Sequence, residues 1–393
     1  MKIRLTKAVG LLKLWITKKG DVYLKKLMGF EFLEKEQTLE YLSDSVIINV
    51  SPDSKRLKTI YDVCDKEKIV FDEKLAQTSR NLVWNFNVAQ KKSFQLPIGG
   101  IVSDNKVLKT DFGYLRLFTP DYGGRFVFKD LVILDMRRIV NTEILIAPWS
   151  HYFRKEYYLF VALIAAKLCR IKDTIPENMF KQALVSYPLY GTTFEKEYLE
   201  LIGFRPEQII DSRKYKVKYC RCILGNHDTW NYPHIQDLLS LKKHIGTKLQ
   251  GLNHTPVVKN RIYIRRAGRR QVVNETELIK LLLKLNFKIY EDIPRSVSEQ
   301  FEIYNQASFI MDPHGSSFTN IIWCQPGTHL FELFPPSFIY DYFLYMSEML
   351  GLSYSAYFYG PMIYDHRYAT INDDVLISIP DIERYLNEFF EAR

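Results

Sequence analysis

A His-Gly pair followed by small hydroxyl residues, 314-HGSS-317, stands between two apolar runs of the sequence. Gly315 permits a backbone turn or the close approach of another group. Ser316, Ser317 or Thr319 can cap the amides of a helix that follows. Free N–H groups and the dipole at such a helix start stabilise a phosphate without any catalytic side chain. The segment therefore predicts an anion-binding loop, with an ordinary capped turn as the alternative.

A second glycine, Gly268, lies among four arginines: Arg265, Arg266, Arg269 and Arg270. Guanidinium groups keep their charge and bind phosphate oxygens in a forked geometry, so several of them at the end of a strand predict a diphosphate clamp. A solvated basic turn is the alternative. In a parallel sheet this loop and the loop at His314 would open at the same edge, which favours one anion site built from both.

These residues need strands and helices to position them. The run 307–311 predicts a strand that ends at Asp312-Pro313, followed by the turn and a helix through Trp323. The run 328–334 predicts the next strand, with Glu332 near its C-terminal end. A carboxylate in that position can accept hydrogen bonds from hydroxyls, as ribose-binding acids do in nucleotide folds, and Thr319 and Asn320 are further candidates for contact with the nucleoside.

Strands and helices alternate in two successive blocks of the chain. The strands of the first block are predicted at 143–149, 182–188 and 207–212, and its helices at 152–169 and 194–203. The second block has predicted strands at 261–266, 286–291, 307–311 and 328–334, and helices at 275–285 and 297–306. The expected fold class is α/β, with two Rossmann-like lobes facing a central cleft and an accessory β-rich N-terminal region.

The domain boundaries follow from the same patterns. We expect an amphipathic basic helix in residues 1–30, an accessory β-rich region at 31–135, a first lobe at 136–250, a second lobe at 251–375, and a C-terminal helix at 376–393 that crosses back to the first lobe.

Composition limits the class of protein. With 393 residues and 47% hydrophobic residues, the chain is long enough for two domains and too apolar to be largely disordered. The net charge of +9 suggests acidic partners, which are phosphorylated substrates, an anionic membrane surface or nucleic acid. Five irregularly spaced cysteines favour reduced thiols in a cytosol.

The N-terminus predicts how the chain could meet a membrane. Leu5, Leu12 and Ile16 share a helical stripe, and lysines and an arginine surround it. Such a helix could lie on anionic lipid, or it could pack on its own domain. We find no transmembrane segment in the sequence, because the longest apolar run, 157–169, is too short. The expected location is cytoplasmic, with peripheral attachment to the inner face of the membrane as the further hypothesis.

The motifs together resemble those of glycosyltransferase family 61. The residues that carry the resemblance are Tyr263 to Arg266, Arg269-Arg270, Asn274-Glu275, Glu299-Gln300, His314-Gly315, Thr319-Asn320, Gly327 and Glu332. A weaker fit is the segment 148-PWSHYF-153, which is similar to the aromatic-rich histidine motif of the family. Two departures are the replacement of the Gly-rich stretch after His-Gly by Ser316-Ser317-Phe318, and the lack of an acidic residue and prolines after His151.

The resemblance implies a GT-B-like fold, with residues 136–250 as the acceptor-side lobe and residues 251–375 as the nucleotide-sugar donor lobe. It also implies an inverting transfer from a nucleotide sugar, usually UDP-linked, to a hydroxyl of a growing glycan such as a capsular or surface polysaccharide. It implies no cofactor and no essential metal, and we find no Asp-X-Asp triplet that would hold one on the diphosphate. Arg266 and Arg270 would bind the diphosphate, together with His314, Gly315, Ser316 and Ser317. Glu332 would lie near the nucleoside.

Inversion needs a base that takes the proton of the acceptor hydroxyl. His151 is the candidate, because histidine titrates near neutrality, and Asp228 and His227 are held in reserve. A structural role for His151 is the alternative.

Two other classes of function compete. The string 225-GNHD-228 occurs in metal-dependent phosphoesterases, but the upstream Asp-X-His and the downstream Gly-His-X-His of those enzymes are absent from the sequence. A nucleic-acid-binding protein would explain the charge, yet the aromatic residues are spread as core residues are, so no nucleic-acid partner is expected.

Overall fold

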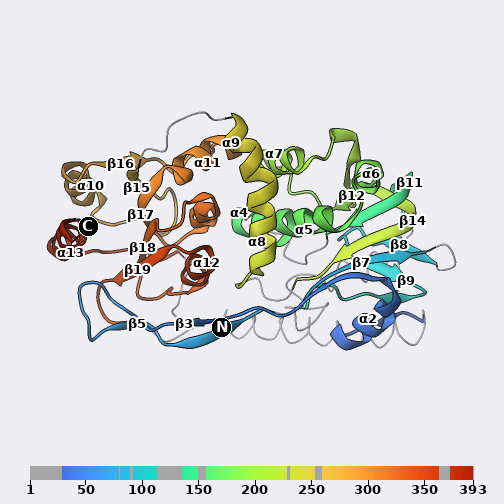
Figure 1. Ribbon diagram of the computed structural model, residues 1–393, viewed down its shortest axis with the longest axis horizontal. Coiled ribbons are helices and arrows are strands. Elements are labelled where there is room, and N and C mark those ends of the chain that lie inside the picture. The colour runs from blue at the N-terminus through green and yellow to red at the C-terminus, as the bar shows by residue number, and fades with distance from the viewer. Residues whose placement is uncertain are drawn as a thin grey trace, which may run out of the picture. The chain divides into compact units, whose positions relative to one another are not determined.

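The chain forms two compact α/β units in a computed structural model that describes residues 29–78, 80–88, 92–112, 135–148, 156–227, 231–252, 259–362 and 372–392. Unit 1 comprises Met1–Asp53 and Thr78–Ile245, and unit 2 comprises Ser54–Gln77 and Gly246–Arg393. The helices and strands of both units are labelled in Figure 1.

Unit 1 is built on a six-stranded sheet with the order β13-β12-β11-β14-β7-β2. Its strands are β2 (Val46–Val50), β7 (Asn81–Asn87), β11 (Arg138–Ala147), β12 (Leu184–Tyr187), β13 (Ile209–Asp211) and β14 (Tyr215–Gly225). The first four in sheet order run parallel, whereas β7 and β2 are antiparallel to their neighbours. The predicted parallel α/β layer is confirmed for β11, β12 and β13, and the long strand β14 was not predicted.

The helices of unit 1 connect these strands. They are α2 (Lys35–Tyr41), α4 (Tyr157–Leu159), α5 (Ala166–Thr174), α6 (Glu177–Gln182), α7 (Thr193–Ile202) and α8 (Ile235–Leu241). A π-helical segment, Phe160–Ala165, joins α4 to α5. The α7 helix begins where Thr192 accepts a hydrogen bond from the amide of Glu195, and it ends at Gly203 in the left-handed conformation, as its sequence predicts.

The N-terminal β-rich region is not a separate body, which corrects the boundary predicted at 31–135. Its strands β2 and β7 extend the main sheet of unit 1, and Trp84 of β7 is fully buried in the same core as Leu145 of β11. A four-stranded sheet adds β1 (Glu31–Phe32), β8 (Ser93–Gln95), β9 (Ile101–Ser103) and β10 (Lys106–Val107). Long-range antiparallel pairing of this kind leaves no local trace in the sequence.

Part of that region belongs instead to unit 2. It contains β3 (Ser54–Leu57), β4 (Ile60–Tyr61), β5 (Ile69–Phe71) and β6 (Lys74–Gln77). Asp62 fastens this segment to the edge of the unit 2 sheet, because its carboxylate accepts hydrogen bonds from the amides of Cys64 at 2.9 Å and Phe358 at 3.0 Å. Lys68 donates to the carbonyl of Phe358 and lies over its ring.

Unit 2 contains a five-stranded parallel sheet with the order β16-β15-β17-β18-β19. The strands are β15 (Asn260–Ile264), β16 (Phe287–Tyr290), β17 (Ala307–Pro313), β18 (His329–Phe334) and β19 (Ser353–Phe358). This order occurs in doubly wound α/β folds, in which ligands bind where the chain changes direction across the sheet. The change lies between β15 and β17.

Helices cover both faces of this sheet (Figure 1). They are α10 (Glu275–Lys284), α11 (Val297–Asn305), the 3₁₀ helix η5 (Ser316–Trp323), α12 (Tyr342–Leu350) and α13 (Ile379–Glu391). A short helix, α9 (Thr247–Leu252), precedes β15 in the chain. The α10 and α13 helices share one face. The α11 and α12 helices pack with η5, through the ring pairs Phe301–Trp323 and Phe318–Phe343.

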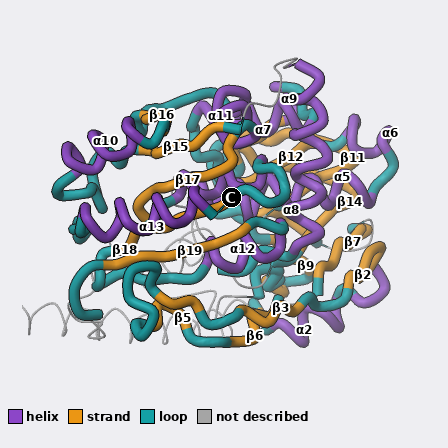
Figure 2. The backbone as a smooth tube through the Cα atoms, turned by 60° about the vertical axis from the view of Figure 1, so that its left-hand side comes forward, coloured by secondary structure: helices purple, strands orange, loops and turns teal. Residues whose placement is uncertain are grey.

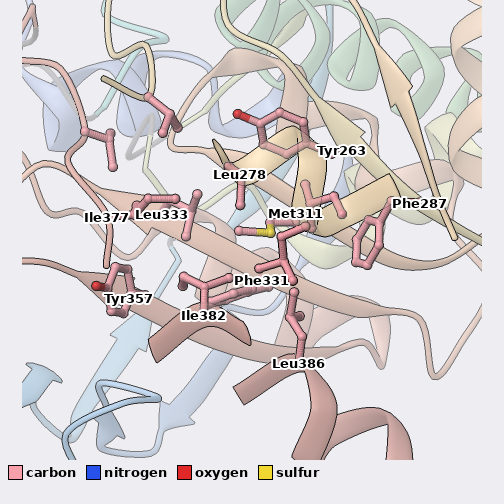
Figure 3. Packing of buried hydrophobic residues seen from close by; sticks show 14 of the residues in the cluster. Tyr263, Leu278, Phe287, Met311, Phe331, Leu333, Tyr357, Ile377, Ile382 and Leu386 are labelled. Carbon is pink, nitrogen blue, oxygen red and sulfur yellow. The ribbon is translucent and has the colours of Figure 1, made fainter. Parts of the chain in front are cut away.

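The core under α10 and α13 joins residues from the strands and both helices (Figure 3). Leu278 of α10, Ile382 and Leu386 of α13 and Met311 of β17 are all completely buried there. Figure 2 shows α13 lying along this sheet. The expectation that the C-terminal helix crosses back to the first lobe is therefore corrected, because its apolar stripe packs on its own unit.

Helices of membrane-spanning length and hydrophobicity are not found among the described residues.

Candidate functional site

The loops that follow β15 and β17 meet at the carboxyl edge of the unit 2 sheet. Arg266 lies two residues after β15, and Gly315 lies two residues after β17. A Cβ atom added to Gly315 would lie 2.0 Å from Nη1 and 2.6 Å from Cζ of Arg266, so the guanidinium rests directly on the glycine backbone. The parallel topology predicts this meeting of the two loops, and Gly315 supplies the space for it.

The guanidinium of Arg266 has no carboxylate partner among the described residues. The side chain is half-buried, and its Nε is buried without a hydrogen-bond partner. A cation in this position carries a desolvation cost that a bound anion would offset. Within the described residues, Arg266 is therefore an arginine of the loop that has no ion pair and that lies against the backbone of Gly315.

Backbone donors lie beside this charge. The first backbone bond of η5 runs from the amide of Phe318 to the carbonyl of Gly315 at 3.1 Å. The amides of Gly315, Ser316 and Ser317 precede it and have no partner in the part of the chain that the structure describes. Amides at a helix start, next to a cation, form a site for an anionic ligand.

The helix itself is 3₁₀ rather than the ordinary helix that the sequence predicts. Thr319 Oγ1 donates to the carbonyl of Ser316 at 2.7 Å, and Asn320 Nδ2 donates to that of Ser317 at 3.2 Å. These side chains compete for carbonyls that an α-helix would use. Thr319 and Asn320 are both buried and brace the loop from inside, and the nucleoside contact predicted for them stays a prediction.

His314 is held by a buried carboxyl group. Its Nδ1 lies 2.5 Å from Oε1 of Glu332, and Oε2 of Glu332 accepts a hydrogen bond from the hydroxyl of Tyr354 at 2.5 Å. Arg270 Nε donates to the carbonyl of His314 at 2.7 Å. Aromatic rings enclose the imidazole: those of Phe334, Phe338, Tyr340, Tyr342 and Phe343.

Burial dominates the electrostatics of this pair. It lowers the pKa of His314 well below its usual value, and the nearby charges of Arg270 and Arg266 lower it further. Burial also raises the pKa of Glu332 well above its usual value. Glu332 has no exposed surface, and its two oxygens are engaged by His314 and Tyr354. The nucleoside-binding role expected for Glu332 stays a prediction.

The sequence predicts Asp312 only as the end of a strand. The structure places it beside the loop of His314. It is completely buried, and it accepts a hydrogen bond from Ser317 Oγ at 2.5 Å. Burial raises its pKa well above the usual value, and the charge of Arg266 partly opposes that rise. Its position at the carboxyl end of a parallel strand was the available signal.

The other arginines of the loop take different roles. Arg265 forms ion pairs with Glu275 at 2.8 Å and Glu291 at 2.5 Å, and these bonds raise its pKa. Its charge is thus already neutralised, which corrects its assignment to the diphosphate clamp. Arg270 is buried and has a left-handed φ of 58°. Arg269 is half-buried and forms no hydrogen bond or ion pair within the described residues.

Residues 171–331 match the family model described as Glycosyltransferase 61. The chain carries a glycosyltransferase family 61 domain. The resemblance inferred from the motifs is confirmed, and the matched segment contains both Arg266 and the His314 loop. No curated protein matches the chain.

The match supports a glycosyltransferase, a class of enzyme that binds a sugar donor and an acceptor. The segment 148–153, with its aromatic-rich histidine motif, lies upstream of the match.

The competing string 225-GNHD-228 has a structural explanation in this glycosyltransferase. Asn226 accepts from the amide of Leu82 at 2.7 Å and donates to the carbonyl of Arg80 at 2.6 Å, which joins β14 to β7. His227 Nε2 lies 2.9 Å from Asp111, and Nδ1 lies 2.7 Å from Nζ of Lys167. Both ring nitrogens of His227 are therefore engaged, and the phosphoesterase alternative is unsupported.

The cluster around His227 is a buried ionic network. Burial lowers the pKa of Lys167 to about 7. Beside it, Arg170 forms an ion pair with Asp237 at 3.3 Å. A cation and an anion that are buried together contribute to packing specificity rather than to ligand capture.

Of the three residues expected to abstract the proton, two are not described by the structure and the third lies in the buried network. His151 and Asp228 lie outside the described residues. His227 lies in the buried network, and its pairing with Lys167 and Asp111 leaves it no free nitrogen for an acceptor hydroxyl.

Proposed function

We propose that the chain is an inverting glycosyltransferase that binds the diphosphate of a nucleotide sugar between the loops after β15 and β17. The contact of Arg266 with Gly315, next to three open backbone amides, carries this proposal. A sugar diphosphate carries its negative charge where a guanidinium and a helix start both favour an anion.

The same groups would assist departure of the diphosphate. When the bond from the sugar C1 to the phosphate oxygen breaks, its electron pair passes to the diphosphate. Fixed donors that are already oriented stabilise this developing charge without reorganisation. The sequence contains no Asp-X-Asp triplet, so we propose that these donors act without an essential metal or cofactor.

The finer features follow from the family resemblance and are proposals. They comprise a GT-B arrangement with two Rossmann-like lobes, a UDP-linked donor, and a hydroxyl of a growing capsular or surface glycan as the acceptor. His151 is the proposed base, which would take the proton of that hydroxyl as it attacks C1 from the face opposite the diphosphate. Peripheral attachment through the basic N-terminal helix at the cytoplasmic face is proposed on the pattern of residues 1–20.

A thermal-shift panel tests the donor site. The full chain is heated with UDP, GDP, CDP, ADP and their sugars, first in EDTA and then with Mg²⁺ or Mn²⁺. A ligand that binds the folded state alone raises its stability. Stabilisation by one nucleotide in EDTA is the expected result, and it identifies the base of the donor.

Paired arginine variants make the test specific. Arg266→Ala is expected to abolish the shift. Arg265→Ala is the matched control, because its ion pairs with Glu275 and Glu291 place it outside the site, and it should keep the shift. The proposal fails if no nucleotide stabilises the wild-type chain, or if both variants respond alike.

A further inference from the structure

His314, Glu332 and Tyr354 form an unbroken hydrogen-bonded chain across three neighbouring strands. His314 follows β17, Glu332 lies on β18 and Tyr354 lies on β19. The links measure 2.5 Å from Nδ1 to Oε1 and 2.5 Å from Oε2 to the tyrosine hydroxyl. These two contacts join the imidazole, the carboxyl group and the phenol into one hydrogen-bonded chain.

The surroundings decide where the proton of this chain lies. Burial, followed by the charges of Arg270 and Arg266, disfavours a charge on the imidazole. Burial also disfavours a charge on Glu332 and Asp341 adds to this effect, while the hydrogen bond from Tyr354 and the charge of Arg270 oppose it. Asp312 lies opposite Glu332 in the register of β17 and β18, and the charge of Glu332 contributes to the raised pKa of Asp312. In the absence of a ligand, the neutral form of both partners is favoured, with the proton on Glu332 and a neutral imidazole.

The imidazole has one remaining polar atom. Nδ1 is engaged by Glu332, and Nε2 has no partner among the described residues. The two ring nitrogens direct their bonds away from each other, so Nε2 is turned from Glu332. His314 directly precedes the open amides of Gly315, Ser316 and Ser317 in the chain.

We propose that Glu332 and Tyr354 are positioning residues of a proton relay that turns His314 into an imidazolium when a diphosphate binds. This inference rests on the proposed function of the site. The O–H bond of Glu332 breaks and an N–H bond forms at Nδ1, so that Glu332 gains one negative charge and His314 one positive charge. The hydroxyl of Tyr354 stabilises the resulting carboxylate. The net charge of the pair does not change.

The relay places a positive charge beside the leaving group only when an anion is present. Nε2 of His314 then donates a charge-assisted hydrogen bond to a phosphate oxygen, and it strengthens as the bond to the sugar breaks. A permanently charged imidazole would carry a larger desolvation cost in this aromatic enclosure.

Nitrogen NMR of the full chain, labelled with ¹⁵N-histidine, observes the relay directly. Pyrophosphate is the probe, because it carries the diphosphate charge without a base or a sugar. His314→Gln assigns the resonance. In the wild-type chain at pH 7, pyrophosphate is expected to convert His314 from the neutral pattern to the doubly protonated one.

Two variants and a control distinguish proton transfer to His314 from a purely structural role of Glu332 and Tyr354. In Glu332→Gln the amide keeps the shape but cannot supply a proton, so His314 should stay neutral and pyrophosphate should bind about tenfold more weakly. Tyr354→Phe should reduce the protonated fraction. Tyr385→Phe, which removes a hydroxyl from the separate His329 and Ser355 network, should change neither readout.

The outcomes distinguish the relay from the proposed function. If pyrophosphate binds and His314 stays neutral in the wild-type chain, the relay is wrong and the donor site stands. If neither pyrophosphate nor any nucleoside diphosphate binds, both fall. Should Glu332→Gln fail to fold, Tyr354→Phe supplies the same comparison, and an unchanged protonated fraction there overturns the role of the chain.

Discussion

Replacing Gly315 by Ala tests whether the guanidinium of Arg266 has to rest on the glycine backbone. The φ angle of Gly315 is −179°, an extended conformation that alanine adopts without strain. The added methyl group would lie 2.0 Å from Nη1 and 3.1 Å from Nη2 of Arg266. Because the clash involves the end of a flexible side chain, the loop should fold while the guanidinium moves away.

The size of the effect follows from the displacement. Carbon and nitrogen atoms in contact lie roughly 3.5 Å apart, so Nη1 must move by about 1.5 Å. Such a movement breaks a hydrogen bond between charged groups, which contributes about 1.5–3 kcal/mol. Since about 1.4 kcal/mol is a factor of ten, Gly315→Ala should weaken pyrophosphate binding roughly 10- to 150-fold.

Calorimetric titration of pyrophosphate into four chains gives the assay. The chains are the wild type, Gly315→Ala, Arg266→Ala and the double variant. If the alanine acts by displacing Arg266, the double variant should bind no more weakly than Arg266→Ala, because both changes remove one interaction. Gly251→Ala is the control, since a Cβ atom there meets nothing within 4 Å. Wild-type affinity in Gly315→Ala, or additive losses in the double variant, would refute the reasoning.

Three further changes probe the parts of the chain around the site. Burial lowers the pKa of Lys167 to about 7. Between pH about 7 and 10, therefore, the unfolded chain binds a proton that the folded chain does not, and stability rises with pH. Lys167→Met should flatten that rise in urea titrations at several pH values; an unchanged slope would contradict the lowered pKa. Asp62→Ala should lower the free energy of unfolding by about 2 kcal/mol, because the buried amide of Phe358 loses its acceptor. Asn226→Ala should lower the free energy of unfolding by a similar amount, about 2 kcal/mol. The response of transfer activity to divalent metals should not change. A metal-dependent loss of activity in this variant would support a phosphoesterase-type metal site at 225-GNHD-228.

The sequence predicts the second α/β block well because its signals are local. The strands β15 to β18 are short apolar runs, and α10 carries leucines at helical spacing, so each element is evident on its own. The strand β14 was missed. Its first half alternates apolar residues with Lys216 and Lys218, which is the pattern of a half-buried strand, so the local signal was present and was not used. Its position in the centre of the sheet depends on partners far away in the chain.

The sequence predicts that the loops after β15 and β17 meet. It does not predict which of Arg265 and Arg266 is ion-paired and which is not. Adjacent residues at the end of a strand point to opposite faces, so Arg265 and Arg266 could not both reach one ligand. The sequence does not say which one does. Glu275 and Glu291, which neutralise Arg265, come from different elements, and only the fold brings them together.

The two glycine-histidine strings of the chain show why a motif alone does not locate a ligand site. Gly225 and Gly315 both lie at or just beyond the carboxyl end of a parallel strand, and both admit a basic side chain to the backbone. A Cβ atom on Gly225 would lie 3.1 Å from Nη2 of Arg170, which is buried and paired with Asp237. At Gly315 the arginine is half-buried and has no carboxylate partner among the described residues. In both units a glycine thus lets an arginine lie against the backbone. In unit 1 that arginine is ion-paired within a buried core, whereas in unit 2 the arginine has no ion pair among the described residues and its charge can attract an anion.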